Sequence, residues 1–159
     1  MATTVNSPQY TEDTIVAEVL IAAPNRAVWA ALTDSVLLAE WWGSPETYRA
    51  EHWTLDLRAG EKWTSSWVGV DGTPFTIGGE LLEVSPMGRL VMTWEPGYEV
   101  IPPTRITYAL KTEGNGTRLR MTHEGFSGYA ASRDRHGTGW QRVLGWLVAF
   151  VERRAAVGG

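Results

Sequence analysis

The sequence predicts an α+β fold in which one long C-terminal helix lies against a curved, seven-stranded antiparallel sheet. The stretch from about His136 to Arg154 places apolar residues at intervals of three and four, which puts them on one side of an α-helix. Nearly all of the chain before it alternates between apolar and polar residues, and Asp71-Gly72 and Asn115-Gly116 are strong hairpin signals. Strands joined by tight turns are antiparallel neighbours, and a strongly twisted sheet curls around its covering helix.

The predicted C-terminal helix has a wide apolar face. Its members share the helical spacing and are Trp140, Val143, Leu144, Leu147, Val148 and Val151. Gln141 and Arg142 fall on the opposite, polar side. Arg153 and Arg154 lie in the last turn, where cations offset the negative end of the helix dipole. A helix this apolar needs a large surface to pack on, and the sheet provides it.

The other elements follow in order from the N-terminus. Residues 1–12 are polar, and we expect them to form a flexible segment before a first strand at residues 14–22. Pro24 is a favourable first-turn residue for one short helix, and Asp34 can cap a second one that runs from Ser35 to Trp41. Six further strands are expected at residues 47–57, 62–68, 75–84, 90–95, 104–112 and 117–124. The chain therefore forms one domain over residues 13–155, with a tail at 156–159.

Composition excludes several classes of function. A chain of 159 residues suits one domain with a real core, and the absence of cysteine excludes disulfides, thiolate catalysis and Cys-ligated zinc. The net charge of -4 argues against nucleic-acid binding. No apolar run reaches the ~20 residues that cross a bilayer, and the first dozen residues do not resemble a secretory signal. We expect a cytoplasmic, bacterial protein that needs no metal or cofactor.

Five phrases of the sequence resemble, in the same order, the START-like (SRPBCC) superfamily, which includes the polyketide cyclases and the birch-pollen allergens. They are IAAPNRAVWAALTD with AEWWG, LRAGEKW, GGELLEVSPMGRLVMTWE, GNGTRLRMTHEGF and HGTGWQRVLGWL, and they extend over about residues 14–152. The most similar branch contains homologues of the activator of heat-shock-protein ATPase. The resemblance implies a helix-grip fold with a cavity between sheet and long helix, in which members bind or transform hydrophobic small molecules. The co-chaperone role of that branch belongs to longer eukaryotic proteins with an additional domain, so the resemblance supports it less than it supports ligand binding.

Nine tryptophans indicate either an aromatic-lined cavity or a core filled by large side chains. Four strands each carry a cluster of one parity that would face the helix, and we expect a ligand-binding cavity there. Its predicted lining residues are Trp63, Trp67, Glu80, Met92, Trp94, Tyr108, Met121, His123, Trp140 and Leu144. The pair Trp41-Trp42 closes the second short helix near the expected mouth of the cavity, where an exposed aromatic side chain would suit a lid and a buried one would pin the helix to the sheet.

Three of these lining residues carry polar groups, and two readings stay open for each. His123 is either a buried neutral histidine bonded to a carbonyl or hydroxyl, or a polar anchor or general base in an apolar pocket. Tyr108 is either a core tyrosine or a hydrogen-bond donor to a ligand carbonyl. Glu80 points inward only if it shares a face with Leu82 and Val84, and the preceding Gly78-Gly79 pair predicts a bulge or bend that disturbs this parity.

Three functions are compatible with these observations. The first is binding of a hydrophobic, aromatic small molecule in the internal cavity. The second is an enzyme of polyketide cyclase or aromatase type that acts on a ligand in the same cavity, with no catalytic residue assigned. The third is a co-chaperone-like interaction module that stimulates a heat-shock-protein ATPase. A homodimer is a further possible assembly.

Overall fold

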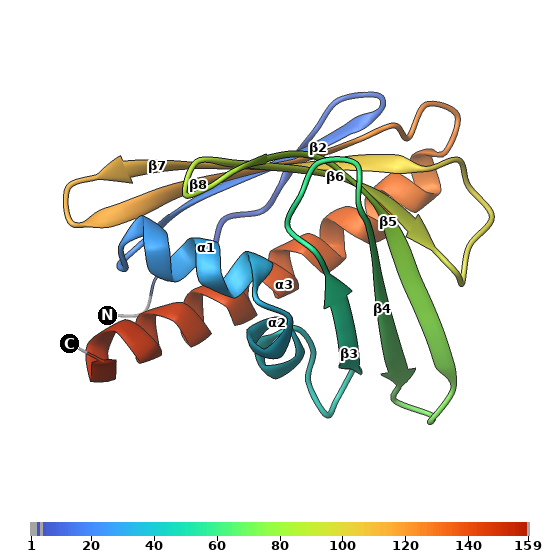
Figure 1. The fold of residues 1–159 in the computed structure, drawn as a ribbon. Helices are drawn as coiled ribbons and strands as arrows, with labels where there is room; N and C mark the ends of the chain where they lie inside the picture. The colour runs from blue at the N-terminus through green and yellow to red at the C-terminus, as the bar shows by residue number, and fades with distance from the viewer. Residues whose placement is uncertain (1–2, 4, 159) are drawn as a thin grey trace.

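A computed structural model describes residue 3 and residues 5–158 of the chain. Within these residues an eight-stranded antiparallel sheet curves around a long C-terminal helix, with strand order β1-β2-β8-β7-β6-β5-β4-β3 (Figure 1). The strands are β1 (Gln9–Tyr10), β2 (Thr14–Ile21), β3 (Tyr48–Leu55), β4 (Lys62–Gly69), β5 (Pro74–Ser85), β6 (Arg89–Pro96), β7 (Thr104–Glu113) and β8 (Gly116–Glu124). The helices are α1 (Asn25–Thr33), α2 (Ser35–Trp41) and α3 (Ala130–Gly158). The predicted α+β, helix-grip fold is confirmed.

One strand more than predicted is present, because β1 lies in the segment that we expected to be flexible. It pairs with β2 through Gln9↔Val16 and Tyr10↔Ile15. The Tyr10 ring packs against α3 at Gly137 and lies 5.4 Å from the Arg133 guanidinium. Two paired residues are too short to produce an alternating pattern, so strand prediction from periodicity could not find them.

Helix α3 is also longer than predicted. It has 29 residues, begins six positions before His136 and continues through residues 156–158 of the expected tail. Its first turns lack an apolar stripe and are held instead by Arg133, which donates hydrogen bonds to the carbonyl oxygens of Thr11 (2.9 Å) and Glu12 (3.2 Å). The periodic pattern therefore located only the part of the helix that packs on the sheet.

The two short helices begin and end close to the predicted positions, and they direct the chain into the interior. The Asp34 carboxylate caps α2 by accepting hydrogen bonds from the backbone N–H groups of Val36 (2.9 Å) and Leu37 (3.2 Å). The Trp41 indole N–H donates to the carbonyl oxygen of Ala31 at 2.8 Å, which ties α2 to α1. These contacts fix the end of α2 and, with it, the direction of the next side chain, Trp42.

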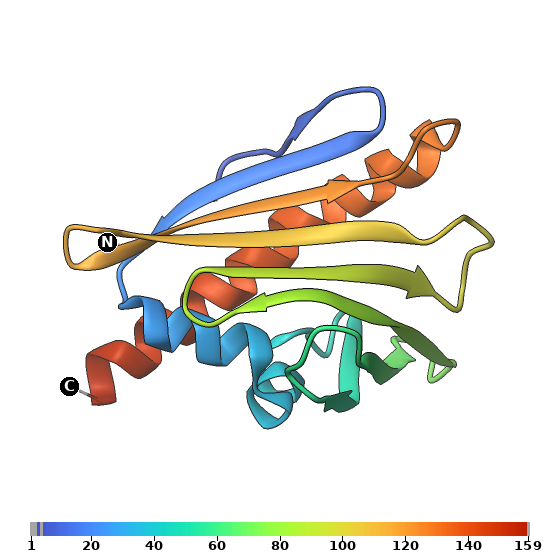
Figure 2. The ribbon, with the colours of Figure 1, turned by 45° about the horizontal axis from the view of Figure 1, so that its top comes forward.

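The sheet bends along β5, where β3, β4 and the first part of β5 turn away from the remaining strands (Figure 2). The pairing of β5 with β6 shifts register between Leu81 and Glu83, shortly after the glycine pair that predicted a bulge. Before the bulge the odd-numbered residues Ile77 and Leu81 face the core, and Leu82 is exposed. The bulge reverses this parity, so the even-numbered Val84 packs against the core. Glu80 is therefore exposed on the outer face, and its predicted place in the cavity lining is wrong.

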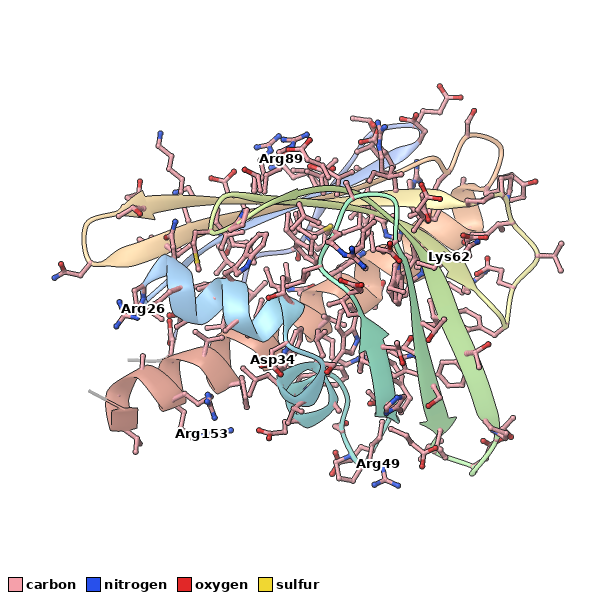
Figure 3. The ribbon with its side chains drawn as sticks, viewed as in Figure 1. Arg26, Asp34, Arg49, Lys62, Arg89 and Arg153 are labelled. Atoms are coloured by element: carbon pink, nitrogen blue, oxygen red, sulfur yellow. The ribbon has the colours of Figure 1, made fainter. Side chains whose placement is uncertain are left out.

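The core lies between the sheet and the helices. The predicted apolar face of α3 is buried, as are the inward faces of β4, β6, β7 and β8. In Figure 3 the interior is filled with side chains, whereas Arg26, Arg49, Arg89 and Arg153 lie at the outside of the molecule. Leu144 and Leu147, which are 1% and 0% exposed, occupy the middle of the helix–sheet contact.

We expect Leu144→Ala or Leu147→Ala to lower the free energy of unfolding by about 2–5 kcal/mol, since each change leaves a cavity in a close-packed core. Urea denaturation at constant temperature measures this loss. Arg153→Ala, an exposed change on the same helix, is the control and should stay within about 0.5 kcal/mol of the wild type. A loss below about 1 kcal/mol for both leucines would contradict the packing described above.

Candidate functional site

Seven tryptophans form one connected cluster at the end of the molecule where the sheet bends. They are Trp41, Trp42, Trp53, Trp63, Trp67, Trp94 and Trp140. Trp42 is the hub of this cluster, because its ring centroid lies 5.2–5.9 Å from those of five others. Of the two readings for Trp42, the structure shows the buried one, with 6% of the residue exposed. Its indole fills space that the sequence left open for a ligand.

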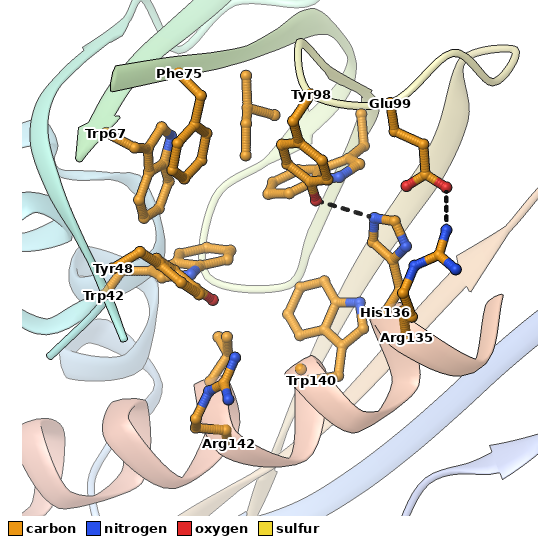
Figure 4. Close-up of a pocket in the computed structure, with 14 residues that line it drawn as sticks. Trp42, Tyr48, Trp67, Phe75, Tyr98, Glu99, Arg135, His136, Trp140 and Arg142 are labelled. Atoms are coloured by element: carbon orange, nitrogen blue, oxygen red, sulfur yellow. Dashed lines mark hydrogen bonds and ion pairs between the residues drawn. The ribbon is translucent and has the colours of Figure 1, made fainter. Parts of the chain in front are cut away.

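A pocket of about 370 Å³ remains beside the tryptophan cluster (Figure 4). It lies between strands β3–β5, the β6–β7 loop and the middle of α3. Its lining residues are Trp42, Tyr48, Trp67, Phe75, Ile77, Trp94, Tyr98, Glu99, Arg135, His136, Gly139, Trp140, Arg142 and Val143. The walls are thus mainly aromatic, and the polar groups are gathered near the rim.

Three of the ten predicted lining residues, Trp67, Trp94 and Trp140, line this pocket. Six others are buried in the core without lining it: Trp63, Met92, Tyr108, Met121, His123 and Leu144. They do face the interior, as strand parity and, for Leu144, helical spacing predicted, but they are packed within the hydrophobic core. Burial also raises the pKa of the Tyr108 hydroxyl, so this group stays protonated.

His123 belongs to a chain of hydrogen bonds in the core that runs from Trp140 to the carbonyl oxygen of Trp94. An indole N–H can only donate, so the 2.9 Å contact between Trp140 Nε1 and His123 Nδ1 makes Nδ1 the acceptor. The proton then lies on His123 Nε2, which donates to Thr104 Oγ1 at 2.7 Å, and Thr104 Oγ1 donates to the carbonyl oxygen of Trp94 at 3.2 Å. Burial, followed by the nearby His136, holds the pKa of His123 well below its usual range. Both ring nitrogens are engaged, which matches the reading of His123 as a buried neutral histidine bonded to a hydroxyl.

A polar corner closes one end of the pocket. Tyr98 and Glu99 come from the β6–β7 loop, and Arg135 and His136 come from α3. Glu99 Oε1 accepts a 2.8 Å hydrogen bond from Arg135 Nη2 within an ion pair, and the Tyr98 hydroxyl makes a long 3.5 Å contact with His136 Nε2 (Figure 4). His136 Nδ1 donates to the carbonyl oxygen of Ser132 at 2.9 Å, which leaves Nε2 as the acceptor that faces Tyr98.

The ionisation states of this corner follow from burial. Burial is the largest cause that lowers the pKa of His136, so its imidazole is neutral at pH 7. Tyr98 is 54% exposed as a residue, but partial desolvation, followed by the negative charge of Glu99, raises the pKa of its hydroxyl to about 12, so the hydroxyl keeps its proton. The corner therefore presents one neutral hydroxyl, one neutral imidazole and one carboxylate already paired with an arginine.

The opposite rim carries Arg142. Its guanidinium carbon lies 5.6 Å from the ring centroid of Tyr48 and 5.5 Å from that of Trp146. The sequence pattern placed Arg142 on the polar side of the helix, and its side chain is indeed exposed, but it also lines the pocket. The part of the pocket wall that α3 provides is a stripe of residues beside the buried face of the helix. Its members, spaced by four and three positions, are Arg135, Gly139 and Arg142. That stripe was the one sequence signal that could have located these residues.

The described residues contain no group of three or more acidic or histidine side chains that could hold a metal ion. In the same part of the chain, no helix has the length and apolar character needed to span a membrane.

A family model described as "Activator of Hsp90 ATPase homolog 1-like protein" matches residues 22–152. The chain belongs to this family. The match covers most of the sequence and confirms the resemblance to the START-like superfamily. None of the curated proteins matches this sequence.

Solved structures agree with the fold of this Hsp90-activator-like family. A protein from Chromobacterium violaceum is 27% identical, with a TM-score of 0.80 over 89% of this chain and 99% of that one. An AHSA1-like protein from Aeromonas hydrophila is 22% identical, with a TM-score of 0.73 over 91% of this chain and 94% of that one. DynU16, a protein of the dynemicin biosynthetic locus, is 22% identical with a TM-score of 0.73, and the match covers 89% of this chain but only 48% of DynU16.

The buried state of His123 predicts a loss of stability at acid pH. Its pKa is depressed in the folded protein, so below about pH 6.5 the unfolded chain binds a proton that the native state excludes. Above about pH 6.5 the contribution of His123 to the free energy of unfolding should not change with pH. At lower pH the free energy of unfolding should decrease, by up to about 1.4 kcal/mol per pH unit for one histidine. His136, whose pKa is lowered in the same direction, adds a further part.

Urea denaturation at about pH 7.5 and about pH 5 measures the effect. His123→Gln should lower stability at both values and reduce the difference between them, whereas His52→Gln, an exposed change on β3, should leave the difference as it is. An unchanged pH dependence in His123→Gln would show that the native state accommodates a charged imidazole at this position.

Proposed function

We propose that this protein binds a flat, hydrophobic aromatic small molecule in the pocket between the curved sheet and α3. The observation that carries this proposal is the composition of the walls: besides Tyr98 of the polar corner, six aromatic side chains surround about 370 Å³, and polar groups lie at two separate points of the rim (Figure 4). Pockets of this kind bind by apolar burial and are made selective by a few polar contacts. The six are Trp42, Tyr48, Trp67, Phe75, Trp94 and Trp140.

The walls are preformed, which favours binding because little side-chain freedom is lost. Trp67 and Phe75 stack with an interplanar angle of 6° at 6.0 Å. Trp67 is further fixed by a 2.7 Å hydrogen bond from its indole N–H to Ser65 Oγ, which itself donates to the carbonyl oxygen of Ile77. A planar ligand can lie against these rings without first having to order them.

A second candidate is an enzyme of polyketide cyclase or aromatase type, and the polar corner favours it. The Tyr98 hydroxyl keeps its proton and can donate to a ligand carbonyl, while the neutral His136 Nε2 can accept a proton from an adjacent carbon or hydroxyl. The structural likeness to DynU16 makes intermediates of biosynthetic pathways a reasonable class of test compound. His123 and Tyr108, our first candidates for such roles, are buried outside the pocket.

The third hypothesis, an interaction module, has less support. An interaction module should expose a continuous apolar patch outside the pocket. Among the described residues, exposed apolar side chains such as Leu20 on β2, Val36 on α2 and Leu82 on β5 lie on separate elements. Tyr98 and Val100 do lie together, but in the β6–β7 loop at the pocket. Stimulation of an Hsp90 ATPase, as in the description of the family, stays a hypothesis whose direct test is an ATPase assay with the purified chaperone.

Gly139 allows a direct test of ligand binding. A Cβ at this pocket-lining position would meet no atom within 4 Å, so Gly139→Leu should fill the pocket without disturbing the fold. We expect intrinsic tryptophan fluorescence of the wild type to change saturably with at least one compound of an aromatic and polyketide-like panel, and Gly139→Leu to abolish that change. Thermal melts should show equal or higher stability, because glycine is a poor helix former.

Gly145→Leu is the matched control, since this glycine also lies in α3 with free space around its Cβ but does not line the pocket. It should leave the titration unchanged. The proposal fails if no compound of the panel saturates, or if Gly139→Leu binds as well as the wild type.

The enzyme alternative makes a separate prediction. If a panel compound is converted, Tyr98→Phe and His136→Gln should lower kcat by about 10²-fold or more, the usual contribution of a positioned acid or base, with only small changes in affinity. Product analysis by chromatography measures turnover, and fluorescence titration of the same variants measures binding. Binding without any product in the wild type would exclude the enzyme function for that compound.

A further inference from the structure

We infer that the ligand of this pocket is an aromatic anion, with a carboxylate or equivalent oxygen group held by Arg142 at the rim. This inference rests on the proposed function and assigns the chemical class of its ligand. Three features of the pocket carry it: the position of Arg142, the balance of charge around the pocket, and the separation of the two polar points of the rim.

Arg142 is held in place by aromatic side chains and not by a carboxylate. Its guanidinium lies against Tyr48 and Trp146, within the distance of a cation–π contact to both rings. Among the described residues Arg142 forms no ion pair, and the same holds for Arg26, Arg49, Arg153 and Arg154, but of these five arginines Arg142 alone lines the pocket. Flanking rings restrict a guanidinium to few orientations, so less freedom is lost when it binds a partner.

The charge balance around the pocket is positive, although the whole chain carries a net charge of -4. The charged groups that line it are Glu99, Arg135 and Arg142, and Glu99 is already paired with Arg135 at 2.8 Å. The neutral imidazole of His136 adds no charge. One uncompensated positive charge therefore remains, and it belongs to Arg142.

The two polar points of the rim lie on different sides of the aromatic walls. Figure 4 shows the guanidinium of Arg142 beside Tyr48, across the pocket from the corner formed by Tyr98, Glu99 and His136. A carboxylate at that corner would face Glu99, whereas at Arg142 it meets a planar donor fork that can form two parallel hydrogen bonds. A flat aromatic acid can thus place its ring between the walls and its carboxylate on Arg142.

A cationic aromatic ligand fits less well, even though aromatic walls can bind cations. It would face the unpaired charge of Arg142, and the one carboxylate in the lining is engaged by Arg135. A neutral aromatic compound would gain the apolar contacts but leave the guanidinium without a partner. The order of affinity should therefore be anion, then neutral compound, then cation.

Isothermal titration calorimetry with three naphthalene derivatives of similar shape tests this order: naphthoate, naphthamide and naphthyl-trimethylammonium. We expect naphthoate to bind the wild type at least about tenfold more tightly than naphthamide, the factor that corresponds to a hydrogen-bonded charge pair. Arg142→Gln should remove this preference by weakening naphthoate binding far more than naphthamide binding, and Arg142→Lys should retain only part of the preference, because lysine keeps the charge but lacks the fork. Higher salt should weaken naphthoate binding alone.

Arg153→Gln is the matched control, an exposed arginine of the same helix that does not line the pocket (Figure 3). It removes the same charge and should leave the preference for naphthoate intact. Equal affinity for naphthoate and naphthamide, or a preference that survives in Arg142→Gln, would overturn this inference while the proposed function stands. If none of the three compounds nor any aromatic compound of the larger panel binds, the inference and the proposed function both fail.

Discussion

The packing of the Trp42 indole against five other tryptophans is the contact on which the rest of this structure depends. It connects the end of α2 with β3, β4, β6 and α3 at the point where the sheet bends. Aromatic pairs of this geometry each contribute about 0.5–1.5 kcal/mol beyond apolar burial, so a hub with several such contacts fixes the position of α2 strongly. Because Trp42 and the tryptophans around it fill much of the space between the sheet and α3, the open space is reduced to the pocket beside this cluster.

The dense indole packing has a cost in hydrogen bonding. The indole N–H groups of Trp53 and Trp94 are buried without an acceptor among the described residues, and such a group costs about 1–3 kcal/mol. Trp63 and Trp140 avoid this cost by donating to the Thr93 carbonyl oxygen at 3.0 Å and to His123 Nδ1 at 2.9 Å. His123 thus acts as an acceptor in the core, and its neutral state is a condition for the arrangement of Trp140 at the pocket wall.

The residues that shape the pocket are separate from the polar groups that, under the proposed function, select its ligand. The walls are aromatic side chains fixed by strand geometry and by contacts with one another, which makes them rigid. These polar groups lie on the β6–β7 loop and on the flank of α3, where side chains can change without disturbing the core. This division explains how one fold in the START-like superfamily can serve different ligands, since function depends on the groups added at the rim.

The sequence by itself determined the order of elements from β2 onward, the antiparallel hairpins, the cap at Asp34 and the inward faces of β4, β6, β7, β8 and α3, because these follow from local periodicity and turn chemistry. Glu80 was misplaced because a bulge at Leu81–Glu83 reverses parity, and such a shift is set by the pairing of two strands. Whether the interior would be a cavity or a filled core depended on where Trp42 points, and only the packing of α2 on the sheet decided that. Tyr98, Glu99, Arg135 and Arg142 meet at one pocket because the sheet curves around α3, a long-range arrangement that no local pattern encodes.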